Sequence, residues 1–172
     1  MPMNLFKKLK SLLSDLFLIL YKCLMALSSN ELFKAIGAPL KNAYSWGAIH
    51  ANGNIVLRVW RDEAKKEKDL GQYRFRLTCY GVWDNLNTFQ VKEREEHIRL
   101  IREGASGYMI IHTSDIPETK CGPRTIKTCE RDRIWEIDQI IEVTDEETGK
   151  NYWGLAKPSP LEITPDFKID WD

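Results

Sequence analysis

At 172 residues the chain has the length of one domain, and folding buries roughly two thirds of the surface of an unfolded chain of this size. Its 25 basic and 25 acidic residues give a formal net charge of zero, which excludes the global positive field of a non-specific nucleic-acid binder. Any contact with a polyanion must therefore come from a local patch.

The first 28 residues differ from the rest, so we divide the chain into an N-terminal amphipathic arm, 1–28, and a single domain, 29–172. The longest uninterrupted apolar run of the arm, Leu16–Tyr21, is far shorter than the roughly 20 residues of a membrane-spanning helix, so no stable membrane insertion is expected. Three interpretations stay open: the arm docks on the domain or a protein partner, lies on a membrane surface, or precedes a start at Met25. A docked arm, or an extension ahead of a start at Met25, is favoured over contact with a membrane.

A β-hairpin is predicted for YSWGAIHANGNIVLRVWRDE, residues 44–63, about a two-residue turn at Asn52-Gly53. Counting outward from that turn sets a glycine opposite Arg58. Because strand side chains alternate, Trp46 then joins the core face, while Arg58 and Trp60 share the other face. Space beside an indole and a guanidinium suits a flat or anionic ligand, and it suits a packed loop equally well.

Along the chain, the other predicted elements do not alternate regularly between strands and helices. They are a capped helix in 28–38, a charged solvated loop or frayed helical turn at 61–71, a half-buried strand in 72–81, a helix in 91–104, a strand buried on both sides in 107–115, further strands in 125–133 and 134–143, and an edge strand in the proline-rich tail. Without regular βαβ units, this order predicts an α+β fold: a small, partly open β-barrel with peripheral short helices.

The four cysteines show no CxxC spacing, which indicates reduced thiols and a cytoplasmic setting. Cys79 lies in an apolar strand pattern, where a buried thiol is the usual state. Cys121 and Cys129 could form a disulfide or join a metal site, but neither has a paired ligand at a favourable spacing, so no metal is expected. Phosphate-cradling glycine motifs and a GxSxG elbow are absent from the sequence, so nucleotide hydrolysis is disfavoured and no cofactor is expected.

A local basic cluster is the clearest binding feature. It lies across a Gly-Pro loop and the strand predicted after it, and its members fall within 14 residues: Lys120, Arg124, Lys127, Arg131 and Arg133. Contacts with phosphates need little more than such side chains, although a solvated loop would have the same composition.

Groups suited to catalysis are few. His112 ends an apolar strand where that strand meets the predicted mouth of the barrel. Asp132, Glu136 and Asp138 are close in sequence, as metal-dependent cleavage would require, but strand alternation explains Glu136 and Asp138 more simply as a solvent face. A binding module is therefore favoured over an enzyme.

The order of YGVWDN, HIRLIREG, GYMIIHTSD and IWEIDQIIEV, across residues 80–143, resembles the PUA-like superfamily, especially its EVE and YTH-like branch. The resemblance implies a small β-barrel that receives a single, often modified, base in an aromatic pocket. It further implies that Trp83, Asp84 and Asn85 match the pocket stretch, with His112 and Ser114 at the strand end.

The sequence therefore predicts a module that binds DNA or RNA, with a plain or modified base held in an aromatic pocket. The base pocket would comprise Trp60, Trp83, Asp84, Asn85, His112 and Ser114, and the phosphates would meet Arg58, Lys120, Arg124 and Lys127. Two alternatives stay open. One is a nucleic-acid-processing enzyme, a nuclease or restriction-related protein, and the other is a protein-interaction module that does not bind nucleic acid.

Overall fold

Nine strands form one open sheet with few helices. The computed structural model describes residues 12–16, 27–79, 88–114, 124–146 and 149–171. In chain order the elements from residue 27 onward are α2 (Ser29–Ala35), β1 (Gly47–Ile49), β2 (Ile55–Trp60), the 3-10 helix η1 (Arg61–Glu63), β3 (Ala64–Lys66), β4 (Tyr73–Arg76), α3 (Phe89–Arg102), β5 (Gly107–Ser114), β6 (Ile126–Cys129), β7 (Arg133–Asp145), β8 (Gly149–Ala156) and β9 (Leu161–Glu162).

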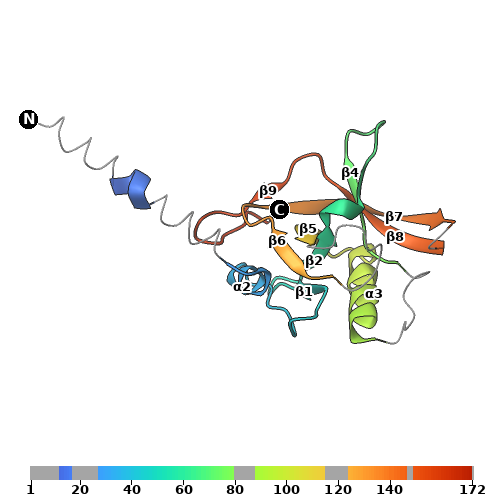
Figure 1. The fold of residues 1–172 in the computed structure, drawn as a ribbon, viewed down its shortest axis with the longest axis horizontal. Coiled ribbons are helices and arrows are strands. Elements are labelled where there is room, and N and C mark those ends of the chain that lie inside the picture. The colour runs from blue at the N-terminus through green and yellow to red at the C-terminus, as the bar shows by residue number, and fades with distance from the viewer. Residues whose placement is uncertain (1–11, 17–26, 80–87, 115–123, 147–148, 172) are drawn as a thin grey trace, which may run out of the picture.

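The strands follow the order β1-β2-β5-β7-β8-β4-β3, with β6 also paired to β5 and β9 to β7 (Figure 1). The two ends of this path, β1 and β3, do not pair with each other within the described residues. The α+β class is confirmed. A PUA-like barrel is not, since the sheet remains open.

The parallel pair β2 and β5 forms the buried centre of the sheet. Trp60 at the end of β2 lies level with His112 on β5. One face of the pair packs against α2 and the C-terminal segment, and the other packs against α3 and β4. The prediction that β5 is covered on both sides is confirmed, and β2 likewise has apolar contacts on both faces.

The hairpin of β1 and β2 is offset by one residue from its predicted register. Gly47 lies opposite Leu57, so the predicted glycine opposite Arg58 is wrong. The loop has three residues instead of two, and Gly53 takes the left-handed conformation with φ of 91°. Because a one-residue slip exchanges the faces of a strand, Trp46 is level with Arg58, whose N–H donates to the Trp46 carbonyl at 2.9 Å. The predicted separation of Trp46 from Arg58 is therefore wrong.

Gly47 lies where α3 approaches β1 most closely. A Cβ at this position would be 2.7 Å from the Val56 carbonyl oxygen and 3.0 Å from His97 Nδ1. Neither the paired backbone nor the buried ring has room to withdraw, so Gly47→Ala should lower the free energy of unfolding by about 1–3 kcal/mol in a urea titration. Gly53→Asn is the control, because a Cβ there meets nothing within 4 Å and asparagine tolerates its φ. Equal losses would contradict this close packing.

The predicted capped helix in 28–38 is confirmed as α2, and the structure shows that it begins at a capping box. Glu31 N–H donates to Ser28 Oγ at 3.3 Å, and Ser28 N–H donates to Glu31 Oε2 at 2.8 Å. Gly37, just beyond the helix, has φ of 79°. Leu32 and Phe33 are fully buried, so the helix that the capping residues predict is also held in place by packing in the core.

The charged segment 61–71 is more ordered than the sequence predicts. Its first residues form η1, which agrees with the predicted helical turn. The next residues form the strand β3, which was not predicted and which pairs antiparallel with β4, so that Lys65 lies level with Arg74. Gly71, with φ of 66°, lies in the turn between the strands. A strand at the edge of a sheet has one edge in solvent and does not need alternating apolar residues. The search for alternating apolar and polar residues therefore does not detect β3. The β3–β4 hairpin projects from the body of the molecule (Figure 1).

The cysteines differ in state. Cys79 is disulfide-bonded, so the prediction of a reduced thiol is wrong there, whereas Cys129 is a free thiol. Burial raises the pKa of the Cys129 thiol, which keeps it protonated at neutral pH.

Of the N-terminal arm, the structure describes residues 12–16, which are helical. Leu12, Leu13 and Leu16 are each more than half exposed, so these side chains do not dock on the domain. Among the described helices, none combines the length and the apolar character that crossing a membrane requires.

Candidate functional site

The predicted binding residues that the structure describes lie on three neighbouring strands. Trp83, Asp84, Asn85 and Lys120 fall outside the described residues, and their roles stay predictions. The others are Arg58 and Trp60 on β2, His112 and Ser114 on β5, Arg124 just before β6, and Lys127 on β6. Because β5 pairs with both β2 and β6, segments far apart in sequence meet at one end of the sheet.

Trp60 is a half-buried indole at the centre of this end. The rings of Trp60 and His112 are 6.2 Å apart in an edge-to-face arrangement, and Arg124 Cζ lies 5.2 Å from the Trp60 ring. The Arg124 guanidinium donates to Asp62 at 2.6 Å and 2.7 Å and to Glu63 at 3.1 Å. Its side chain is only 2% exposed. A base stacked on this face of Trp60 would therefore have to displace a guanidinium that is already paired.

His112 connects β5 to α2. Its Nδ1–H donates to the Ile110 carbonyl at 2.9 Å, which leaves Nε2 to accept from Ser29 Oγ at 2.8 Å. Burial, and next the charge of Arg58, lower the pKa of His112 to about 3, so the ring is neutral at pH 7. With 1% of its surface exposed, His112 has no free edge for a base in this conformation.

The sequence does not reveal that Ser29 is the hydrogen-bond partner of His112. The two residues are 83 positions apart, and Ser29 resembles any serine at the start of a helix. A serine hydroxyl donating to histidine is also the pairing of a nucleophile with its base. Ser29 is only 6% exposed, however, so the contact serves here as a tether between α2 and the sheet.

Arg58 is also directed inward. It donates to the carbonyls of Ala43 at 3.1 Å and Ser45 at 2.8 Å, and it bonds the side chain of Asn30. Its Cζ lies 5.5 Å from the Phe33 ring. Burial lowers the pKa of Arg58, but a guanidinium remains charged. These contacts hold the segment before β1 against α2 and occupy donors that a phosphate would need.

Lys127 and Ser114 lie nearer to solvent than the other predicted residues. Lys127 is exposed on β6, and Ser114 is half-buried on the paired end of β5. They mark the rim of the predicted site.

Comparisons with protein-family models, with curated proteins and with solved structures each find no match. The PUA-like resemblance therefore stays a prediction. In the part of the chain that the structure describes, no group of three or more His, Cys, Asp or Glu side chains could hold a metal ion.

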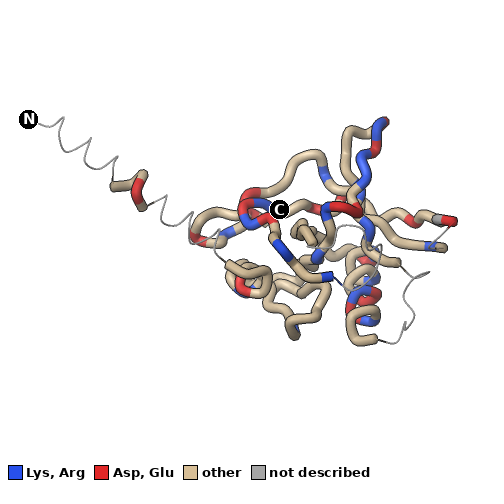
Figure 2. Tube along the Cα trace, viewed as in Figure 1, with Lys and Arg blue, Asp and Glu red and all other residues tan. Residues whose placement is uncertain are grey.

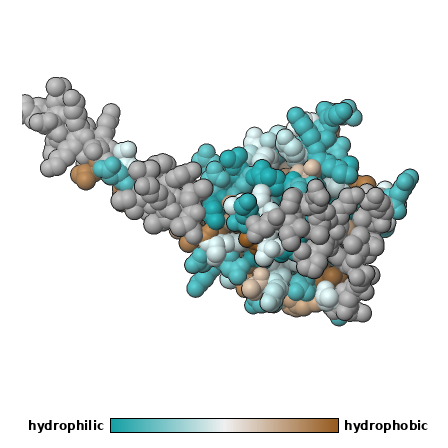
Figure 3. Space-filling view, in the orientation of Figure 1, coloured by the Kyte–Doolittle hydropathy of each residue, from teal (hydrophilic) through white to brown (hydrophobic). Residues whose placement is uncertain are grey.

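A second basic surface, which sequence reasoning missed, covers one face of β3, β4 and β8. Lys65 lies opposite Arg74, and Arg76 lies opposite Trp153. Since residues two apart on a strand share a face, these four side chains lie on the same side of the sheet. Basic residues recur along the hairpin in Figure 2, and Figure 3 shows its surface as hydrophilic.

Three lysines of this hairpin are accessible. Lys65, Lys66 and Lys68 are exposed, and within the described residues none of them makes an ion pair. Arg74 Nε, by contrast, lies 2.8 Å from Glu67. The signal in the sequence was the adjacent Lys65-Lys66 pair, which is typical of an edge strand.

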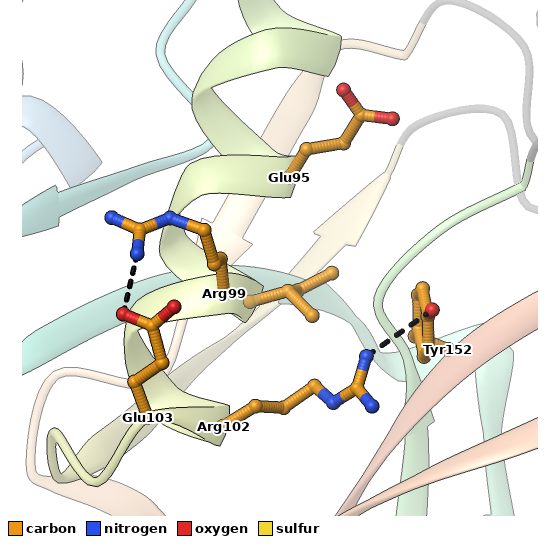
Figure 4. Close-up of a pocket in the computed structure, with 6 residues that line it drawn as sticks. Glu95, Arg99, Arg102, Glu103 and Tyr152 are labelled. Atoms are coloured by element: carbon orange, nitrogen blue, oxygen red, sulfur yellow. Dashed lines mark hydrogen bonds and ion pairs between the residues drawn. The ribbon is translucent and has the colours of Figure 1, made fainter.

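An open hollow of about 470 Å³ lies between α3 and β8 (Figure 4). It is lined by Glu95, Ile98, Arg99, Arg102, Glu103 and Tyr152. Arg99 pairs with Glu96 and Glu103, and Arg102 donates to Tyr152 Oη at 3.4 Å. The lining charges are of both signs and pair largely with their neighbours, so this hollow favours no single class of ligand.

Proposed function

We propose that the chain is a nucleic-acid-binding module whose main contact with the phosphate backbone is the β3–β4 hairpin. The observation that carries the proposal is the set of exposed lysines Lys65, Lys66 and Lys68, which make no ion pair in the described structure and stand on a projecting hairpin. Phosphate contacts require accessible cations and no particular sequence-specific geometry. A chain of zero net charge can provide them locally.

Base recognition at Trp60 is the finer part of the proposal. The three residues of η1 join Trp60 directly to β3, so the half-buried indole is adjacent along the chain to the exposed lysines. Stacking of one base on an aromatic ring contributes roughly 1–3 kcal/mol. Lys127 and Ser114 on the rim would then contact a nucleotide of DNA or RNA that carries a plain or modified base.

Binding without catalysis is favoured over nucleic-acid processing. The ring of His112 is buried with both nitrogens bonded. Of the carboxylates considered for cleavage, Glu136 pairs with Lys157 at 2.7 Å and Asp132 with Arg133 at 3.3 Å. Acting groups would need to be free and brought together in one cleft.

Fluorescence anisotropy of labelled oligonucleotides, single-stranded and duplex, tests the proposal. The triple variant Lys65→Gln, Lys66→Gln, Lys68→Gln should weaken binding about tenfold or more at moderate salt. It should also flatten the plot of log affinity against log salt by roughly 2, since each lost phosphate contact removes about 0.7–0.9 from the slope.

The matched control is Lys34→Gln, Lys41→Gln, Lys92→Gln, because these lysines are exposed elsewhere and the change in net charge is the same. This control should keep nearly the full affinity. Equal losses in the two triples, or no binding of any oligonucleotide by the unaltered protein, would contradict the proposal. Cleavage of the oligonucleotide on addition of magnesium would support the enzyme alternative instead.

A further inference from the structure

One indole on the hairpin face is surrounded by three cations. Lys65 Nζ lies 5.2 Å from the Trp153 ring centre, Arg74 Cζ 5.0 Å and Arg76 Cζ 4.9 Å. Each cation is attracted by the negative face of the ring. The ring does not remove the repulsion among three positive charges gathered around it.

Among the described residues, one carboxylate forms an ion pair with this cluster. Glu67 pairs with Arg74 Nε at 2.8 Å, and Lys65 has no ion pair among the described residues. The arginine side chains are half-buried and Lys65 is exposed, so the cluster is reached from solvent on the Lys65 side. A bound anion would be attracted by the positive charge of Lys65, which has no ion pair among the described residues.

The indole N–H of Trp153 points independently to a missing acceptor. Trp153 is 2% exposed, and its Nε1–H finds no acceptor in the described part of the structure. Buried donors in folded proteins are nearly always bonded. An oxygen-rich anion beside the ring would provide both the acceptor and the negative charge.

We infer that Lys65, Arg74 and Arg76 form a binding site for a phosphate group beside Trp153. Guanidinium groups suit phosphate because their planar N–H donors match pairs of phosphate oxygens, and the lysine adds a mobile point charge. The inference rests on the proposed function where the phosphate belongs to a nucleic-acid backbone. The same chemistry would hold a free phosphorylated small molecule.

Nuclear magnetic resonance of the ¹⁵N-labelled full chain tests this site through its indole N–H signals. Addition of sodium pyrophosphate should move the Trp153 signal in a saturable way, whereas sodium chloride at the same ionic strength should not. Trp153→Phe assigns the signal by its loss, and backbone triple-resonance assignment does so if that variant fails to fold. The signal of Trp171, distant along the chain and packed on Tyr108, is the internal control.

Two variants distinguish the loss of this binding site from a general loss of positive charge. Lys65→Gln changes one exposed side chain and should weaken pyrophosphate binding several-fold, and adding Arg74→Gln should weaken it more than tenfold. The matched pair Lys92→Gln, Arg99→Gln on α3 removes the same two charges from exposed positions and should leave binding unchanged.

The two sources of phosphate give different outcomes. Competition between pyrophosphate and an oligonucleotide for the Trp153 signal supports the site and assigns it to the backbone. A response to pyrophosphate alone, with no oligonucleotide binding, supports the site and overturns the proposed function. Lysine-dependent oligonucleotide binding that leaves the Trp153 signal unmoved, with no response to pyrophosphate, overturns the site and keeps the function. If the protein responds neither to pyrophosphate nor to an oligonucleotide, both the phosphate site and the proposed function are overturned.

Discussion

The free energy of unfolding should fall by about 4 kcal/mol between pH 7 and pH 5, because two neutral histidines are buried in cationic surroundings. Burial, followed by the charges of Arg94 and Lys41, lowers the pKa of His97 to about 4. Burial, followed by the charge of Arg58, lowers the pKa of His112 to about 3.

The direction follows from which state binds the proton. In the unfolded chain a histidine has a pKa near 6.5. Below that pH the unfolded state therefore binds protons that the folded state does not bind, and this stabilises the unfolded state. The stability that His97 and His112 provide is complete above about pH 6.5 and is lost as the pH falls towards the folded-state pKa. Each ring contributes about 2 kcal/mol of the loss at pH 5.

Urea titrations at half-unit steps from pH 7.5 to pH 5 measure this effect. His97→Gln should reduce the slope of stability against pH by about half, even though it also lowers the stability at pH 7. Ring C–H chemical shifts of the folded protein give a second reading, which requires no variant. Rings that become protonated near pH 6.5 without unfolding, or a flat stability profile, would contradict the prediction.

Arg94→Ala should lower the free energy of unfolding by about 3–5 kcal/mol, the range typical of removing one partner from a buried charged network. Arg94 is 3% exposed, and its Nη2 donates to the Trp46 and Arg58 carbonyls, both at 2.7 Å. Beside it, Glu93 accepts from Ser45 Oγ at 3.1 Å and from the Trp46 N–H at 3.0 Å. The variant would remove one donor from each of these two carbonyls, although the Trp46 carbonyl keeps the Arg58 backbone N–H at 2.9 Å, and it would remove the cation next to the buried Glu93 in the chain.

Arg99→Ala on the same helix is the matched control. Its side chain is 52% exposed and pairs with Glu96 and Glu103 at the surface, so its loss should cost less than about 1 kcal/mol. Chemical denaturation of both variants at pH 7 gives the comparison. Similar small losses for Arg94→Ala and Arg99→Ala would show that the buried network does not hold α3 to the sheet.

Local sequence signals predicted several elements correctly. The capping box at Ser28 and Glu31 marks the start of α2, and Gly104, with φ of 112°, follows the end of α3. The long apolar run beginning at Gly107 became the central strand β5. Such signals depend on residues within one or two turns of each other, so they remain visible without the fold.

The register of the first hairpin shows where local reasoning fails. The dipeptide Asn52-Gly53 fits both a two-residue turn and the three-residue loop observed, and the choice shifts every pairing by one. The close fit of Gly47 beneath His97 is compatible only with the observed register. Packing of α3, far along the chain, is therefore part of what selects it.

The sequence by itself determined the α+β class, the places of most helices and strands, and the net charge of zero, because these depend on composition and short-range periodicity. Only the tertiary structure decided that His112 and Arg58 face inward and that Lys65, Arg74 and Trp153 share one face. The physical reason is that burial and charge clustering arise between strands distant in sequence, and their pairing is set by the packing of the whole domain.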